Sequence, residues 1–240
     1  MAITALVYGN TGVGKSTSLR TLNPKTTFII DADRKGLGWK GWRKQYNKEN
    51  DNFAQISDVK DVNQAFKVIN ELPRFAHIKT LVLDGLSTVM IDDEVRRSKE
   101  KGFDKWTELA SSVWGLVSEI GTDKFRTDLN IILIGHLQVD DDGFCHIKTS
   151  GRRLEKYVLE SKFNTVLFAK IVDGEHVFET KPNNSSARSM MDCFESDIIP
   201  NDMQYVIDTL RKYEDDDDGE DNGGGGDAQT VNGIFDMKEE

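Results

Sequence analysis

The stretch Gly9-Asn10-Thr11-Gly12-Val13-Gly14-Lys15-Ser16 decides how this chain folds. It matches the pattern G-x-x-x-x-G-K-[ST], in which glycines let successive backbone N–H groups point at phosphate oxygens. The apolar run before it, residues 2–8, predicts a buried strand. Residues 15–22 after it predict a helix, whose positive N-terminal end adds to the cradle. This order predicts a phosphate-binding loop that holds a nucleotide through residues Gly9 to Thr17.

Two side chains of the loop and one distant aspartate predict a site for ATP and Mg²⁺. Lys15 is expected to neutralise the β- and γ-phosphates, and the Ser16 hydroxyl to ligate the metal. Asp84 follows the β-rich run 80–83, which places its carboxylate at the carboxyl edge of the sheet, where ligands of open α/β folds bind. We expect Asp84 to be the second metal contact; the alternative is an ordinary Asp-Gly turn.

The acid that activates the attacking water has to come from another strand, because Gly85 and not Glu follows Asp84. The run 26–30 predicts a second strand, which ends at Asp31-Ala32-Asp33. We predict Asp33 as the general base, with Asp31 as the second candidate, against the alternative of a polar strand ending.

A fourth strand, predicted over 130–134, is followed by two polar candidates for sensing the γ-phosphate, His136 and Gln138. We select Gln138 for the catalytic set of Lys15, Asp33, Asp84 and Gln138. An unspecialised polar strand end is the alternative.

The order of elements predicts an α/β fold. Strands alternate with helices at 62–72 and 106–120, which favours a mainly parallel sheet with helices on both faces. Residues 165–172 and 176–180 predict an antiparallel hairpin, and 202–213 a last helix. Residues 1–213 then form one ATPase domain.

The formal net charge of −10 belongs to the end of the chain. Residues 214–240 contain eleven acidic residues and one Lys, so residues 1–213 are neutral. This acidic, glycine-rich segment buries too little apolar surface to order itself, which predicts a disordered tail.

The two cysteines lack metal-binding or disulfide spacing, and no apolar run approaches the roughly 18 residues of a membrane span. We expect a cytoplasmic protein without membrane contact.

These motifs resemble the RecA-type ATPase core. Ile30-Asp31-Ala32-Asp33 is similar to that family's strand ending in a catalytic acid, and Leu81-Val82-Leu83-Asp84 to its metal-binding strand. More narrowly, residues 3–213 resemble compact phage-encoded RecA-like proteins, some of which are single-strand annealing recombinases. In that family the acid is Glu, so the shorter Asp33 implies slow hydrolysis or a need for DNA to position the water.

The resemblance also implies partners. RecA-like proteins assemble into rings or filaments with nucleotide between subunits, which makes Lys181 and Arg188 candidates for a contact in trans with the nucleotide of a neighbouring subunit. It implies single-stranded DNA as a partner, in the host cytoplasm if a phage encodes the chain, and a single-strand-binding protein as a further one. Loops that follow the fourth strand face DNA in this family, and here they carry Lys148, Arg152 and Arg153.

A second candidate for DNA contact is the segment 34–48, which has six basic residues, three aromatic residues and no acid. Cations for phosphates and flat rings for bases are what single-strand binding requires. The alternative is a surface loop whose tryptophans tuck under the domain or pack on a neighbouring subunit. The candidate residues are Lys35, Trp39, Lys40, Trp42 and Arg43.

The sequence therefore predicts an ATP- and Mg²⁺-dependent RecA-like ATPase that oligomerises on single-stranded DNA and promotes annealing or strand pairing. A P-loop nucleotide or metabolite kinase is one alternative, although no compact Arg-rich lid is present. An ATP-binding switch without DNA binding is another. AAA+ machines are disfavoured because no Glu follows Asp84.

Overall fold

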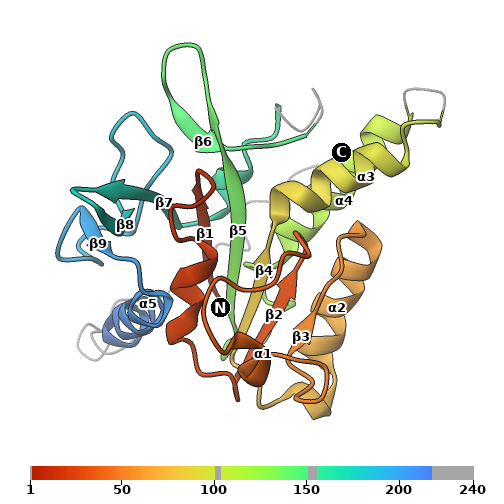
Figure 1. Ribbon diagram of the computed structural model, residues 1–240, viewed down its shortest axis with the longest axis horizontal. Coiled ribbons are helices and arrows are strands. Elements are labelled where there is room, and N and C mark those ends of the chain that lie inside the picture. Colours follow the sequence, from red (N-terminus) through yellow and green to blue (C-terminus); the bar gives the residue numbers. More distant parts are fainter. Residues whose placement is uncertain (1, 101–103, 151–155, 218–240) are drawn as a thin grey trace, which may run out of the picture.

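The computed structural model describes residues 2–100, 104–150 and 156–217. Its described residues form one sheet with the strand order β3-β2-β4-β5-β1-β7-β8-β9, and β6 pairs with β5 beside this path (Figure 1). The strands are β1 (Ile3–Gly9), β2 (Thr27–Asp31), β3 (Phe53–Ala54), β4 (Thr80–Asp84), β5 (Asn130–Val139), β6 (Cys145–Ile147), β7 (Thr165–Val172), β8 (Glu175–Glu179) and β9 (Ile198–Pro200).

The strands from β3 to β7 along this order run parallel, and β8 and β9 extend the sheet antiparallel. In register, Gly9 at the end of β1 lies beside His136 of β5, and Asp31 of β2 lies beside Asp84 of β4. Parallel strands end at a common edge, so residues far apart in sequence meet there. This arrangement confirms the predicted α/β fold, a mainly parallel sheet with antiparallel strands near the C-terminus.

Helices cover both faces of the sheet, as predicted. Alternate strand residues pack under α2, α3 and α4 on one face and under η1, α1 and α5 on the other. The α-helices are α1 (Trp42–Gln45), α2 (Val59–Glu71), α3 (Leu86–Arg96), α4 (Asp104–Glu119) and α5 (Met203–Asp217); the 3-10 helices are η1 (Ser16–Thr21), η2 (Pro73–Phe75) and η4 (Leu159–Lys162).

Local chemistry explains the ends of α2. The Asp58 side chain accepts a hydrogen bond from the backbone N–H of Lys60 at 2.8 Å, which caps the first turn. Pro73 follows the helix and cannot continue it. Between these ends Val62, Phe66 and Ile69 lie on one buried face, at the spacing that predicted this helix.

Several elements differ from their predicted bounds. The helix after the phosphate-binding loop is a 3-10 helix, η1, which is shorter than residues 15–22. Helix α3 has no counterpart among the predicted elements, nor do the short strands β3, β6 and β9. Helix α5 continues through Asp217, which corrects the expectation that the disordered tail begins at residue 214. The remainder of the predicted tail, 218–240, lies outside the described residues.

Candidate nucleotide-binding site

The phosphate-binding loop follows β1 and curls back over it. Gly12 and Gly14 have φ values of 85° and 92°, a region that favours glycine, so the turn depends on them. The ammonium of Lys15 donates to the carbonyl oxygens of Gly9 at 2.8 Å and Asn10 at 2.7 Å. Burial lowers the pKa of Lys15 to about 8, an effect that the charge of Asp84 partly offsets. Two backbone carbonyls thus hold the lysine at the loop.

A pocket of about 390 Å³ opens above this loop, which is within the usual size range of small-molecule sites. The phosphate-binding loop supplies one wall, the segment after β2 supplies another, and β5 contributes one side chain. The lining residues are Thr11, Gly12, Gly14, Lys15, Ser16, Thr17, Lys35, Gly36, Leu37, Gly38 and His136. Of the loop predicted to bind the cofactor, Gly9 and Asn10 instead hold Lys15, and Val13 packs against the core.

The predicted Mg²⁺ ligands lie together. Asp84 is 2% exposed, and a hydrogen bond from the Ser16 hydroxyl reaches its carboxylate. Burial raises the pKa of Asp84, against the opposing charge of Lys35 and this hydrogen bond. Its Oδ2 atom is buried and has no hydrogen-bond partner, which is costly unless a cation or a ligand satisfies it. A hydroxyl beside an unsatisfied carboxylate oxygen is a donor set that fits Mg²⁺.

Asp33 lies at the same edge of the sheet, with its side chain 10% exposed. It accepts hydrogen bonds from the Lys35 ammonium and the Thr88 hydroxyl, and His136 Nε2 lies 3.8 Å from its Oδ1. Burial alone would raise the pKa of Asp33. The imidazole of His136 and the ammonium of Lys35 outweigh that cost and hold the pKa well below its usual range. Asp33 is therefore a carboxylate at neutral pH.

Asp31 is held by structural hydrogen bonds to one of its oxygens, while its other oxygen, Oδ1, is buried without a hydrogen-bond partner, as Asp84 Oδ2 is. The Oδ2 atom of Asp31 accepts from the backbone N–H of Gly36 at 2.7 Å and from Gln55 Nε2 at 2.9 Å, and the residue is fully buried. These bonds fix the start of the loop that forms the second pocket wall. Between the two acids of this strand ending, Asp33 is the one that reaches the pocket residues Lys35 and His136.

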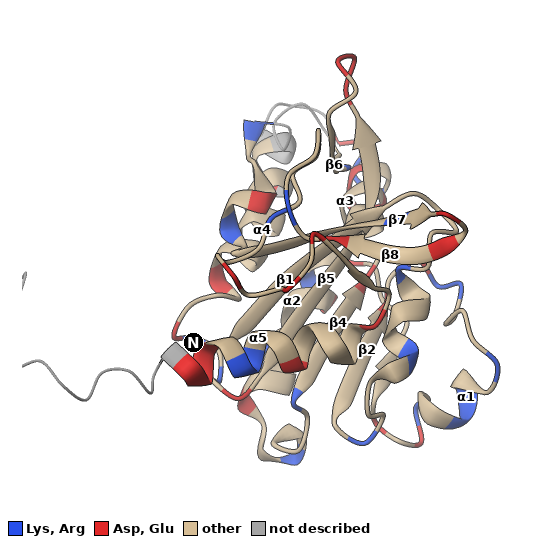
Figure 2. Cartoon of the chain, turned by 90° about the vertical axis from the view of Figure 1, so that its left-hand side faces the viewer, with Lys and Arg blue, Asp and Glu red and all other residues tan. Residues whose placement is uncertain are grey.

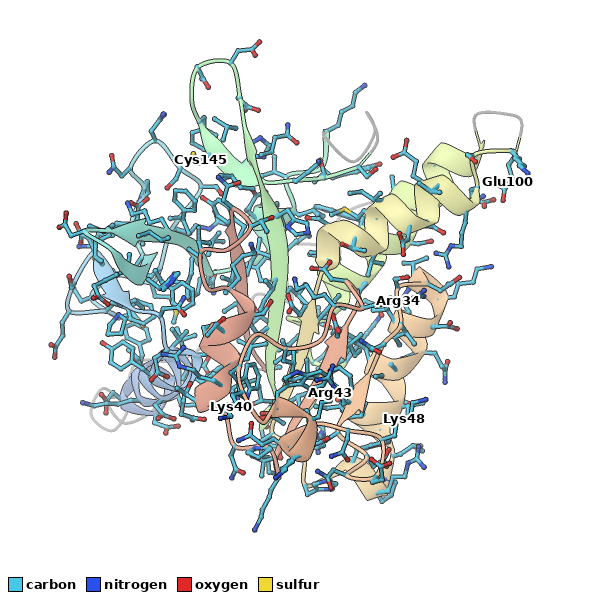
Figure 3. The ribbon with its side chains drawn as sticks, in the orientation of Figure 1. Arg34, Lys40, Arg43, Lys48, Glu100 and Cys145 are labelled. Atoms are coloured by element: carbon cyan, nitrogen blue, oxygen red, sulfur yellow. The ribbon has the colours of Figure 1, made fainter. Side chains whose placement is uncertain are left out.

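The segment 34–48 is divided between the pocket and the surface. Lys35 lines the phosphate pocket, so its position differs from that expected of a DNA-contacting side chain alone. Trp39 packs edge-on against buried Tyr46, and Trp42 packs against Phe53, so these rings lie against their own domain. The cations of this segment remain exposed: in Figure 3 Lys40, Arg43 and Lys48 lie around α1, and Arg34 lies beyond the end of β2.

The two candidates of β5 are placed differently. His136 lines the phosphate pocket, whereas Gln138 lines a separate pocket of about 400 Å³ with Asp140, Phe144 and His146. The structure therefore brings His136, and not Gln138, beside Lys15 and Asp33. Its register explains this, because β5 continues past Gly9 and carries Gln138 beyond the loop, where it pairs with His146 of β6.

Of the remaining candidates that the structure describes, Lys148, Lys181 and Arg188 do not line the phosphate pocket. Lys148 is exposed, and its backbone N–H donates to the carbonyl of His136 at 2.7 Å. Arg152 and Arg153 lie outside the described residues. Lys181 pairs with Asp197 at 2.7 Å on the surface.

Arg188, the second candidate for a contact in trans, is engaged inside its own chain. Its guanidinium donates to the backbone carbonyl of Phe163 at 3.0 Å and to that of Glu160. These two hydrogen bonds attach the guanidinium to the backbone of the segment that precedes β7.

Three residues near the pocket were missed from the sequence. Thr88 and Ser87 belong to α3, and Ser87 Oγ links this helix to the backbone of His136 at 3.0 Å and to the carbonyl of Lys148 at 2.8 Å. The sequence does carry a signal for α3, because the apolar residues Leu86, Val89 and Met90 after Gly85 have the i, i+3, i+4 spacing of a helix. The third residue, Lys35, was assigned to DNA only.

The chain belongs to the AAA-domain family: a family model described as an AAA domain matches residues 1–188, which include every element of the phosphate pocket. This is a family of P-loop ATPases.

Two further comparisons complete this result. Among curated proteins, none matches this chain. Among solved structures, a KaiC-like protein from the hyperthermophilic archaeon Pyrococcus horikoshii OT3 is similar, with a TM-score of 0.40 and 15% identity over 73% of this chain and 76% of that chain. Separately, none of the helices within the described residues combines the length and apolar character needed to cross a membrane.

Proposed function

We propose that this protein hydrolyses ATP with Mg²⁺, that single-stranded DNA stimulates this turnover, and that it acts as a homo-oligomer in strand annealing or pairing. One observation carries the hydrolase part. Lys15 lines the phosphate pocket, and two carboxylates lie directly behind its lining: Asp84 beside Ser16, with an unsatisfied oxygen, and ionised Asp33 beside Lys35 and His136. A lowered pKa such as that of Asp33 also occurs in purely structural ion pairs. The match to a family of P-loop ATPases supports the hydrolase part independently of that pKa.

Each of these side chains has a separate task. Lys15 leaves its carbonyl partners to bind phosphate oxygens. Ser16 and Asp84 would hold Mg²⁺, which supplies charge neutralisation of the phosphates when it is bound. Asp33, with its low pKa, is a weak proton acceptor, so its carboxylate orients the attacking water through a hydrogen bond more readily than it removes a proton. His136 lines the pocket and lies 3.8 Å from Asp33, so we expect it to respond to the terminal phosphate.

The exposed cations Lys40, Arg43 and Lys48 support the DNA part of the proposal. They belong to the chain segment whose beginning, 35–38, forms a wall of the phosphate pocket. In Figure 2 this region around α1 carries basic residues, whereas the tip between β5 and β6 is acidic. Because Trp39 and Trp42 pack on the domain, we expect contact with DNA phosphates to dominate over base stacking here.

The experiment is the steady-state ATPase rate with and without single-stranded DNA, with Lys15→Ala as the blank. Stimulation by single strands that the blank lacks supports the proposal. Turnover without stimulation, together with no retention of DNA in ATP or a non-hydrolysable analogue, overturns the DNA part. Tight nucleotide binding without turnover overturns the hydrolase part and favours an ATP-binding switch.

A pair of matched variants separates DNA contact from a general loss of charge. Lys40→Gln with Arg43→Gln removes two exposed cations of the segment 34–48, and Lys25→Gln with Lys67→Gln removes two exposed cations elsewhere. We expect the first pair to weaken DNA binding and to lower the slope of log affinity against log salt by roughly one to two, at about 0.7 to 0.9 per phosphate contact. Equal effects of both pairs would show that only net charge matters.

A further inference from the structure

Lys35 is a second cation at the phosphate pocket, and its partner is the predicted catalytic acid. Its ammonium pairs with the carboxylate of Asp33, while the side chain remains 49% exposed. Lys35 lines the pocket together with Lys15 and Ser16. The exposed side of Lys35 therefore faces the space that phosphates would fill.

The backbone at Lys35 is fixed from several directions, although its side chain can move. The next residue, Gly36, donates its N–H to buried Asp31 and has a φ of 77°. A Cβ on Gly36 would lie 2.6 Å from the Trp42 ring, and one on Gly38 would lie 2.9 Å from Thr17 Oγ1. The loop is thus packed closely against the aromatic segment and the phosphate-binding loop, and a side chain at either glycine would force Trp42 or Thr17 to shift.

Charge balance in the pocket depends on what occupies it. Without nucleotide, Asp33 is the acidic partner of Lys35, and Lys35 and Lys15 repel one another across the pocket. A terminal phosphate carries more negative charge than one carboxylate and has several acceptor oxygens, so it competes for the same ammonium. The exchange would leave Asp33 with Thr88 and the nearby His136.

We propose that Lys35 is a latch: it holds Asp33 in the nucleotide-free protein and transfers to the terminal phosphate of ATP, which frees Asp33 to orient water. This inference rests on the proposed ATPase function and adds a residue that distinguishes ATP from ADP. Lys35 therefore releases Asp33 at the same time as it binds the terminal phosphate. Hydrolysis removes the terminal phosphate, and Lys35 returns to Asp33.

The first test measures binding and not turnover. Dissociation constants for the non-hydrolysable analogue AMP-PNP and for ADP, each with Mg²⁺, are compared between the unmodified chain and Lys35→Met, with Lys25→Met as the control for loss of one exposed lysine. We expect Lys35→Met to weaken AMP-PNP binding about tenfold while ADP changes much less, because one charge-assisted hydrogen bond is lost. Lys35→Arg should recover part of the difference.

The second test is a double-mutant cycle with Asp33→Asn. Removing the carboxylate frees Lys35 in advance, so Asp33→Asn should tighten AMP-PNP binding severalfold, and combination with Lys35→Met should abolish that gain. Equal weakening of AMP-PNP and ADP by Lys35→Met, or additive effects in the cycle, would overturn the latch while leaving the ATPase intact. If the unmodified chain binds neither nucleotide, the proposed function itself fails, and the latch with it.

Discussion

The carboxylate of Asp33 lies where the side chain of residue 85 would begin. Gly85 has a φ of 113°, and a Cβ on it would be 2.7 Å from Asp33 Oδ1 and 3.0 Å from the Asp33 backbone nitrogen. An acidic side chain directly after Asp84 and an acid at position 33 therefore exclude one another in this backbone. The chain places its acid in the turn after β2, which ends at Asp31, and glycine after Asp84 is the steric consequence.

Gly85→Ala is expected to lower both stability and hydrolysis. Gly174 is the matched control, since its φ of 86° imposes a similar backbone cost but a Cβ there meets nothing within 4 Å. Chemical denaturation should show a loss of about 1 kcal/mol for Gly174→Ala and roughly 2 to 4 kcal/mol for Gly85→Ala. Equal losses would mean that the contact with Asp33 is unimportant.

Asp33→Asn and Asp31→Ala should separate chemistry from architecture. Asp33→Asn is expected to lower the ATPase rate about 10²- to 10⁴-fold while nucleotide still binds, because a carboxylate orients water and an amide does so poorly. Asp31→Ala leaves Gly36 N–H and Gln55 without their acceptor, and should lower the free energy of unfolding by about 2 kcal/mol. Rates from single-turnover assays and unfolding curves measure the two effects; a stable, inactive Asp31→Ala would contradict the assignment.

His136→Ala should lower the ATPase rate more than Gln138→Ala. His136 lines the phosphate pocket and lies 3.8 Å from Asp33, whereas Gln138 lines a different pocket. Removing the imidazole also removes a group that keeps the pKa of Asp33 low. Parallel measurement of kcat and KM for ATP tests this ranking. A larger loss of ATPase rate with Gln138→Ala would instead support Gln138 as the γ-phosphate sensor that the sequence predicts.

Two buried tyrosines predict the alkaline behaviour of the fold. Burial raises the pKa of Tyr8 and of Tyr46 to about 12, above the ordinary value of 10. Between about pH 10 and pH 12 each tyrosine loses its proton in the unfolded chain but keeps it in the folded chain. The free energy of unfolding therefore falls as pH rises, by up to about 1 kcal/mol per pH unit for each tyrosine. Unfolding curves across this range should show the slope, and Tyr8→Phe should reduce it. Full tyrosinate absorbance near pH 11 in the folded chain would contradict the prediction.

Much of the sheet could be predicted because its strands are buried on both faces. The segments Thr80–Asp84 and Asn130–Ile134 are near-continuous apolar runs, which is the pattern of a covered parallel sheet. Helix α2 was predictable from its apolar spacing and from Pro73. The short strands β3, β6 and β9 were not, since two or three residues carry no period, and their pairing depends on neighbours supplied by the rest of the fold.

The sequence by itself determined the phosphate-binding loop, since glycines at fixed spacing before Lys15 and Ser16 specify a local backbone shape that needs no distant partner. It also determined that Asp84 ends a strand, whereas the strand before Asp33 ends at Asp31 and leaves Asp33 in the following turn. Only the tertiary structure decided which side chains surround them. Strand register brought His136, and not Gln138, to the pocket, and the packing of Gly36 under Trp42 brought Lys35 there. Register and loop packing arise from contacts between segments far apart in the chain, which local patterns do not encode.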